Sequence, residues 1–339
     1  MRHRLVPLLA AVFLAGACGG SSPSAPAPTP VPQPPAAPTP PSDTWSVEGR
    51  VTATLSGTPV PNARVAPEVG EAVRTDALGR FRLAGTSNPG VSPFKVTVSA
   101  AGHLTRETWL TWRRGERTDV TIDLVARQAP FSLMLLRELA RNGFEEPGTL
   151  EPIQRWTVSP SFYIRTIVEG STRNRQVDPS LVSLISSTVR TAVRDFTGGR
   201  LRVAALETGT AVRPERDGWV NITVVSSLEE NVCADATVGT NPGTIRLRYR
   251  WCDCGGSALS PGLIGHEVGH VMGFWHVSDR DSIMHPRIEN PCTTFRLPDH
   301  ERHHAAIAYS RPPGNTDPDR DPSGAALALP RLRIVDRRH

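Results

Sequence analysis

Hydrophobic and polar residues alternate in short runs between residues 44 and 127. An apolar residue at every second position is typical of strands that bury one face. Turns rich in glycine, proline, asparagine and aspartate separate the runs, which read VEGRVTA, NARVAP, GRFRLA, FKVTVSA and DVTIDLV. The pattern predicts an all-β sandwich over residues 44–127.

The apolar period lengthens to three and four residues beyond residue 130. This period predicts an amphipathic helix that ends near Gly143. A second helix is predicted over 178–196, because Asp178 is a suitable N-cap and Pro179 fits the first helical turn. Each helix has one apolar side that can face a core.

Strand-like runs lie between and after these helices, namely FYIRTIV, LRVAALE, WVNITVV and the residues 234–239 and 244–250. A third helix is expected after Ser260 and Pro261, which repeat the capping signal of the second. A final helix is predicted to extend through Tyr309. Its three histidines are expected on a solvated face rather than as metal ligands, and they are His300, His303 and His304.

The chain begins with the basic segment MRHR, followed by the apolar stretch LVPLLAAVFLAGA. A basic segment before an apolar stretch too short to span a bilayer predicts an export signal over residues 1–18. Cys18 lies between LAGA and two glycines, an arrangement that resembles the lipobox of bacterial lipoproteins. The resemblance implies a lipid on Cys18, which would anchor the protein to a membrane at the cell envelope or cell surface, with the outer membrane as one location. The alternative is an ordinary secretory peptide cut near Ala17, which would give a secreted protein.

Two segments have compositions that are poorly suited to forming a core. Residues 19–43 consist almost wholly of serine, proline, alanine, glycine and threonine, which predicts an extended linker. Residues 313–339 are rich in proline, glycine, aspartate and arginine, which predicts a disordered tail. Local docking of residues 327–334 is the lesser alternative for that tail.

The 38 basic and 33 acidic residues give a net charge of +5, which raises the question of nucleic-acid binding. All but one of the basic residues are arginines, the exception being Lys95. They form no compact basic stretch with interleaved aromatic residues, so nucleic acid is not an expected partner. A chain of 339 residues with 38% hydrophobic residues can form two ordinary domains.

The segment HEVGHVMGFWH, which begins at His266, supplies the candidate chemistry. On a helix, His266 and His270 project from one face and can bind a single zinc ion at about 2.1 Å. Gly273 permits a sharp turn that brings His276 back as a third ligand. Glu267 then lies beside the metal, where its carboxylate can take a proton from a bound water. Three protein ligands leave one coordination position for that water.

The segment Ser-Ile-Met-His-Pro follows, with its methionine at position 284. Together the two motifs resemble the metzincin zinc metalloendopeptidases, in which a Met-turn forms a hydrophobic floor under the metal. The spacing of His276 and Met284 is similar to that of the matrixin-like branch. The chain departs from matrixins at Val277, where they usually carry serine, and at His285, where they usually carry tyrosine. Pro286 stands where the related astacins have an additional tyrosine ligand.

The resemblance implies an α+β metzincin catalytic domain over residues 128–312, with a mixed twisted sheet and a zinc-binding helix. It also implies an edge strand near 234–240 that pairs with an extended substrate, and a pocket shaped by 285–298. One Zn²⁺ is expected, because no histidine between His103 and His266 could form the structural zinc site of matrixins. The implied site residues are the zinc ligands His266, His270 and His276, the general base Glu267 and the Met-turn residue Met284.

Residues 57–65 and 75–81 of the predicted sandwich read GTPVPNARV and TDALGRF. They resemble the carboxypeptidase regulatory-like domain, a transthyretin-like sandwich. This part of the chain concentrates no nucleophiles or metal ligands, and His103 is most simply a loop residue. We expect a spacer or accessory role, with carbohydrate or protein binding as the alternative.

Four cysteines remain after Cys18, an even number in a chain expected to be exported, and they allow three disulfide connectivities. A turn at the sequence NPGT is expected to place Cys233 opposite Cys252, within reach of a disulfide. Cys254 then pairs with Cys292. Free thiols are the alternative, and the spacing of Cys252 and Cys254 is too short for a usual structural zinc knuckle.

The main functional prediction is a zinc-dependent endopeptidase that hydrolyses peptide bonds in protein or peptide substrates, with Glu267 as general base. The alternative from another class is a noncatalytic surface protein, for binding or adhesion, that retains the zinc site. A structural zinc is normally closed by a fourth protein ligand and gains nothing from an adjacent base, so Glu267 favours the enzyme. Cleavage restricted to the chain itself or to one partner is a third possibility.

Overall fold

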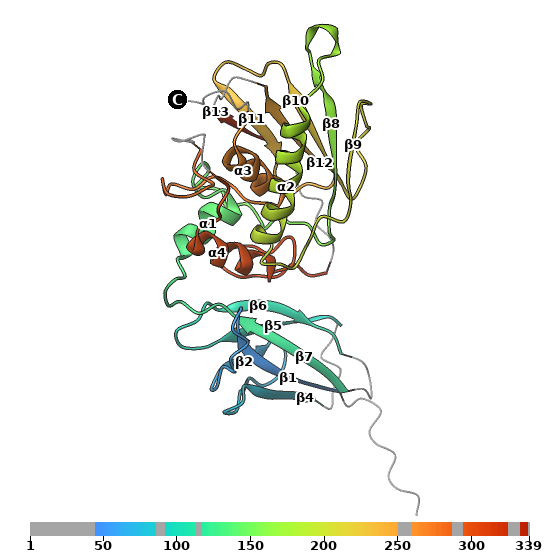
Figure 1. Ribbon diagram of the computed structural model, residues 1–339. Coiled ribbons are helices and arrows are strands. Elements are labelled where there is room, and N and C mark those ends of the chain that lie inside the picture. Colours follow the sequence, from blue (N-terminus) through green and yellow to red (C-terminus); the bar gives the residue numbers. More distant parts are fainter. Residues whose placement is uncertain are drawn as a thin grey trace, which may run out of the picture. The chain divides into compact units, whose positions relative to one another are not determined.

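The structure is a computed structural model that describes residues 45–85, 92–112, 117–249, 259–286, 294–324 and 333–337 (Figure 1). The predicted export signal and linker, residues 1–43, lie outside the described residues, as do four of the five cysteines. These four are Cys18, Cys252, Cys254 and Cys292. Within the described part of the chain, no helix has the length and apolar character needed to cross a membrane.

The first part of the fold is a β-sandwich, as the alternating pattern predicts. One sheet has the strand order β4-β1-β7 and the other the order β3-β2-β5-β6. Alternate residues face the core between them: Phe94, Val96 and Val98 of one strand are buried while their neighbours are partly exposed. The strands are β1 (Trp45–Ala53), β2 (Arg64–Pro67), β3 (Val73–Arg74), β4 (Arg80–Gly85), β5 (Phe94–Ser99), β6 (Arg106–Leu110) and β7 (Arg117–Leu124).

The second part is a mixed α/β region built on a sheet of order β13-β11-β12-β10-β8-β9. Strands β12, β10, β8 and β9 are parallel, whereas β11 is antiparallel to β12 and β13 is antiparallel to β11. The strands are β8 (Ser161–Glu169), β9 (Leu206–Gly209), β10 (Trp219–Val225), β11 (Val232–Thr237), β12 (Gly243–Arg248) and β13 (Arg333–Arg337).

Helices α2 and α3 pack against each other, and α3 also packs on β11 and β12 (Figure 1). The predicted caps form: Asp178 accepts from the Ser180 backbone N at 2.9 Å, and Ser260 accepts from the Leu263 N at 3.0 Å. Helix α1 packs against α4. The helices are α1 (Leu133–Arg141), the short 3₁₀ helix η1 (Thr172–Asn174), α2 (Pro179–Phe196), α3 (Pro261–Val271) and α4 (Asp299–Tyr309).

The register of β11 and β12 differs from the one predicted around the NPGT turn. Ala234 lies opposite Leu247 and Ala236 opposite Ile245, so the same register places Cys233 opposite Arg248 rather than Cys252. The chain between β11 and β12 therefore reverses direction earlier than predicted. The Thr244 N donates to the Thr237 hydroxyl at 3.0 Å across this turn. The strand-pair argument for a Cys233–Cys252 bridge is therefore wrong.

The tail predicted to be disordered, residues 313–339, is ordered in both stretches that the structure describes. Residues 333–337 form β13, and Asn315 and Asp319 are almost completely buried. Composition misleads here because acidic and amide groups at alternate positions each bind an arginine, and two of these groups are buried. These pairs are Asn315 with Arg141, Asp317 with Arg137, Asp319 with Arg311, and Asp321 with Arg106.

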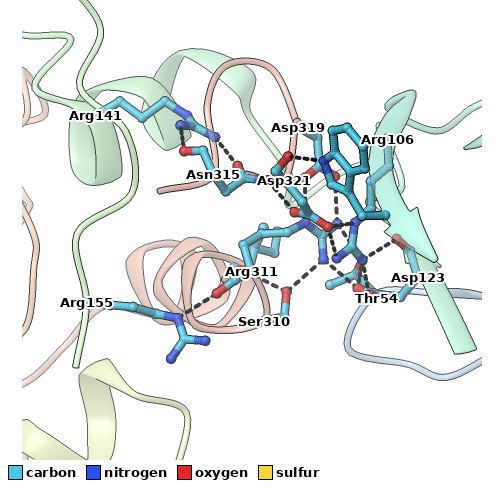
Figure 2. Close-up of polar contacts among 12 residues, drawn as sticks. Thr54, Arg106, Asp123, Arg141, Arg155, Ser310, Arg311, Asn315, Asp319 and Asp321 are labelled. Carbon is cyan, nitrogen blue, oxygen red and sulfur yellow. Dashed lines mark hydrogen bonds and ion pairs between the residues drawn. The ribbon is translucent and has the colours of Figure 1, made fainter. Parts of the chain in front are cut away.

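Arg311 lies at the centre of this network (Figure 2). Its guanidinium donates to both carboxylate oxygens of Asp319, each at 2.7 Å, and to Asp123 Oδ2 at 2.6 Å. Asp123 belongs to β7 of the sandwich, and its other oxygen accepts from Arg106 of β6. The segment after α4 is thus held by charged hydrogen bonds to the sandwich.

Candidate metal centre

Helix α3 and the turn after it bring three buried histidines together. His266 and His270 are one helical turn apart on α3, and both are fully buried. The chain then turns at Gly273, whose φ of 102° is in the left-handed region, and returns with His276. A Cβ at Gly273 would overlap the backbone oxygen of Gln154, so the turn requires glycine. The candidate ligand atoms of the three histidines lie within 4.8 Å of one another.

Hydrogen bonds from the far side of each ring define which nitrogen faces the centre. His266 Nδ1 is 2.6 Å from the Ile283 carbonyl oxygen, and His270 Nδ1 is 2.7 Å from the Phe274 carbonyl oxygen. A carbonyl oxygen only accepts, so we assign the proton of each ring to Nδ1 and a lone pair to Nε2. His276 Nδ1 is 2.5 Å from Glu145 Oε1, which leaves its Nε2 for the centre as well.

This donor set fits one zinc ion. The Nε2 atoms of His266 and His270 are 2.9 Å apart, and the assigned tautomers direct a lone pair from each into the same space. Two ligands at about 2.1 Å in tetrahedral geometry are separated by roughly 3.4 Å, which is close to this arrangement. A cation between the rings would turn the repulsion of two lone pairs into two bonds. Within the part of the chain that the structure describes, these histidines are the one group able to hold a metal.

The carboxylate predicted to act as general base lies inside the same helix. Glu267 follows the first histidine directly and its side chain is fully buried. Its neighbours along α3 are apolar or metal-ligand candidates. A buried carboxylate next to a metal-binding histidine is the arrangement that proton transfer to or from a bound water requires.

Met284 lies against helix α3 beside the candidate metal ligands. A Cβ placed on Gly269 would be 2.5 Å from Met284 Sδ and 2.7 Å from Phe196 Cζ. Gly269 lies between the two helical histidines, so its missing side chain allows the methionine to reach the helix there. Met284 is fully buried, and its backbone oxygen accepts from the Val277 N at 3.1 Å. Met284 thus packs against α3 at the glycine between His266 and His270.

Two buried glutamates hold the chain between His276 and Met284. Glu138 of α1 accepts from the Ser278 N at 3.0 Å and from its hydroxyl at 2.9 Å. Glu301 of α4 accepts from the Ser282 hydroxyl, the Ile283 N and the Met284 N. Burial raises the pKa of Glu301, and these hydrogen bonds oppose the rise only in part.

Sequence reasoning missed these glutamates, together with Glu145. A signal does exist for two of them: Glu138 lies among the apolar positions of α1, and Glu301 occupies the buried side of α4. A charged residue on a helix face that is otherwise buried indicates a specific partner. Glu145 lies in a turn after α1 and offers no such pattern, because only the fold brings it to His276.

The predicted solvated face of α4 is wrong at His304. This histidine is fully buried, its Nε2 accepts from the Ser132 N at 2.8 Å, and its Nδ1 is 2.6 Å from the His300 carbonyl oxygen. The helical period places His304 on the same side as Glu301 and Ala308, which face the interior. Burial lowers the pKa of His304. Its hydrogen bond from the Ser132 N joins α4 to the N-cap of α1.

The other predicted residues lie away from the histidine cluster or outside the described residues. His103 is on a loop of the sandwich, where its Nδ1 is 2.9 Å from the Ala101 carbonyl oxygen. Cys233 of β11 is disulfide-bonded, and its partner lies outside the described residues. The prediction that the cysteines form disulfides is thus supported at this position, but the connectivity stays a prediction.

The comparisons with known proteins give one family match and several similar solved structures. No curated protein matches the chain. Among solved structures, two interface mutants of a type II cohesin–X-dockerin complex from Acetivibrio cellulolyticus are similar at 18% and 19% identity, with TM-scores of 0.19 and 0.16. The matches cover 24% and 23% of this chain and 57% and 51% of those chains.

One family model matches the chain, over residues 46–125, and it describes the carboxypeptidase regulatory-like domain. The match ends before the histidine motif, and no peptidase family is matched. The matched residues span the seven strands of the sandwich almost completely. The chain therefore contains an N-terminal carboxypeptidase regulatory-like domain, followed by a mixed α/β region.

Proposed function

We propose that the mixed α/β region is a zinc-dependent endopeptidase of the metzincin type, with His266, His270 and His276 as the zinc ligands and Glu267 as the general base. The observation that carries this proposal is the convergence of three buried imidazoles, two from α3 and one from the turn after it, beside the buried Glu267 carboxylate. Among the described residues the cluster has three ligands, so a coordination position is left for water.

Zinc bound there would polarise the scissile carbonyl and lower the pKa of a water molecule. The residues of the chain supply the remaining chemistry. Glu267 accepts a proton from the water and delivers it to the leaving amine. The Ile283 and Phe274 carbonyls hold the first two histidines in the tautomer that presents Nε2.

The surrounding fold supports the same proposal. Strands β12, β10, β8 and β9 are parallel, and β11 forms an antiparallel strand beside α3. The contact of Met284 with α3 at Gly269 supports a Met-turn role for this residue. A noncatalytic role for the metal would not account for a buried carboxylate adjacent to a ligand.

The test is cleavage of unfolded casein and of a mixed fluorogenic peptide library by the full chain, with zinc quantified in parallel. Glu267→Gln removes the general base at nearly constant volume, and a chelator removes the metal. The proposal predicts cleavage that is lost in the variant while one zinc per chain stays bound. Stoichiometric zinc without cleavage would refute the endopeptidase, and absence of zinc would refute the metal centre itself.

A further inference from the structure

The C-terminal strand β13 pairs with the edge of β11 that faces away from β12. Strand β11 pairs with β12 on one side and with β13 on the other, so β13 ends the sheet (Figure 1). The pairing is antiparallel and runs from Val232 opposite Arg337 to Thr237 opposite Arg333, with an irregularity between Val232 and Ala234. A segment nearly a hundred residues further along the chain thus satisfies main-chain groups that an edge strand would otherwise expose.

This edge lies next to the candidate metal centre. Helix α3 packs directly on β11. The Gly239 N, two residues beyond the end of β11, donates to the His270 carbonyl oxygen at 2.9 Å. Thr237, which lies opposite the first residue of β13, is therefore only a few residues from a backbone contact to a candidate zinc ligand.

The proposed peptidase activity gives a second reason to regard this edge as a binding surface. A peptidase must hold its substrate in an extended conformation, and the exposed edge of a strand does so through main-chain hydrogen bonds that do not depend on side-chain identity. Antiparallel addition beside β11 would place such a peptide along the zinc-binding helix. The same hydrogen bonds are made in the structure by β13.

We propose that strand β13 (Arg333–Arg337) is an intramolecular competitor, which occupies the strand edge where an extended substrate adds. This inference rests on the proposed function. It adds a form of regulation, because cleavage requires release of β13, and it identifies the preferred substrates as unfolded segments able to displace a strand. A tethered segment has a local concentration on the order of 1 mM, so even weak pairing with a Kd of about 100 µM would raise the apparent KM roughly tenfold.

The first experiment compares the full chain with a chain that ends at Gly324. The matched control ends at Arg337 and keeps all of β13. The shortened chain is expected to show an apparent KM at least about threefold lower with a similar kcat, and the control is expected to match the full chain. Equal KM values in all three proteins would overturn the competition.

A second variant covers the case in which the shortened chain fails to fold. Ile334→Pro and Val335→Pro together, in the full chain, remove two backbone donors from β13 and leave the rest of the tail in place. Far-UV circular dichroism and bound zinc should be unchanged in this variant. Its apparent KM should fall as in the shortened chain, and an unchanged KM with a folded protein would also overturn the proposal.

A binding measurement separates this proposal from the proposed function. A fluorescein-labelled peptide of residues 325–339 is titrated into the chain ending at Gly324, and hydrogen exchange of the β11 amides is followed. Saturable binding that restores β11 protection and is displaced by an unlabelled unfolded casein fragment supports the shared edge, even if no protein cleaves. Absence of binding, or binding that the casein fragment does not displace, refutes the shared edge whether or not the full chain is a peptidase.

Discussion

Replacement of Arg311 by leucine tests whether the network after α4 stabilises the fold. The Arg311 side chain is only 2% exposed, and so is that of its bidentate partner Asp319. In the variant, the Asp319 carboxylate keeps one hydrogen bond, from Asn315 Nδ2 at 3.0 Å, but loses its counter-charge in a buried position. Removing one partner of a buried ion pair typically costs about 3–5 kcal/mol, because the remaining charge is left desolvated and unpaired.

The matched control is Arg137→Leu, which breaks the neighbouring pair with Asp317. These two side chains are 41% and 22% exposed, so water screens the pair. A pair of this kind contributes about 0–1 kcal/mol. Urea unfolding of both variants, with the midpoint compared at constant slope, measures the difference. A loss in Arg311→Leu no larger than that in Arg137→Leu would refute the reasoning.

The same network predicts a pH dependence through Asp123. Burial raises the pKa of Asp123, but Arg311, Arg106 and the Thr54 hydroxyl together outweigh burial and hold the pKa below its ordinary value. A lowered folded-state pKa contributes stability that is complete above the unfolded value and is lost as the pH falls through the folded value. The stability difference between the parent and Arg311→Leu should therefore shrink below about pH 4. A difference that stays constant down to pH 2 would contradict this assignment.

Three further predictions concern the metal centre and the N-terminus. Glu145→Gln should weaken zinc binding about 10- to 100-fold, because the Glu145 carboxylate orients the His276 ring through a hydrogen bond. Competition with a chromogenic chelator measures the zinc affinity, and an unchanged affinity would show that Glu145 does not position His276. Gly273→Ala should lower the free energy of unfolding by about 1–3 kcal/mol, measured by thermal unfolding, because the new Cβ would overlap the Gln154 backbone. Gly148→Ala is the control, since a Cβ there meets no atom within 4 Å, and equal effects of the two substitutions would count against the steric argument. Cys18→Ala should abolish incorporation of labelled fatty acid, and retained label would exclude this cysteine as the lipid site.

Local patterns in the sequence were sufficient for much of the fold and for the centre of the candidate site. His266 and His270 needed only the helical repeat, and the caps at Asp178 and Ser260 needed only the residues next to them. Strand alternation in the sandwich is local in the same sense, because each residue's face follows from its position in the strand. These features depend on contacts between residues close in the chain, and such contacts can be predicted from a single sequence.

The groups that surround the site were decided by the tertiary structure. Glu145 reaches His276 across 131 positions of the sequence, and Arg311 reaches Asp123 across 188. No local period or spacing predicts such pairs, because the packing of the helices and the sheet determines which residues come into contact. The tail illustrates the same limit: its polar composition indicates disorder when water is the only partner, and it becomes ordered because buried arginines and the edge of β11 supply better ones. The sequence by itself determined how two candidate ligands are spaced on one helix, and only the folded chain determined what positions them and what covers the strand beside them.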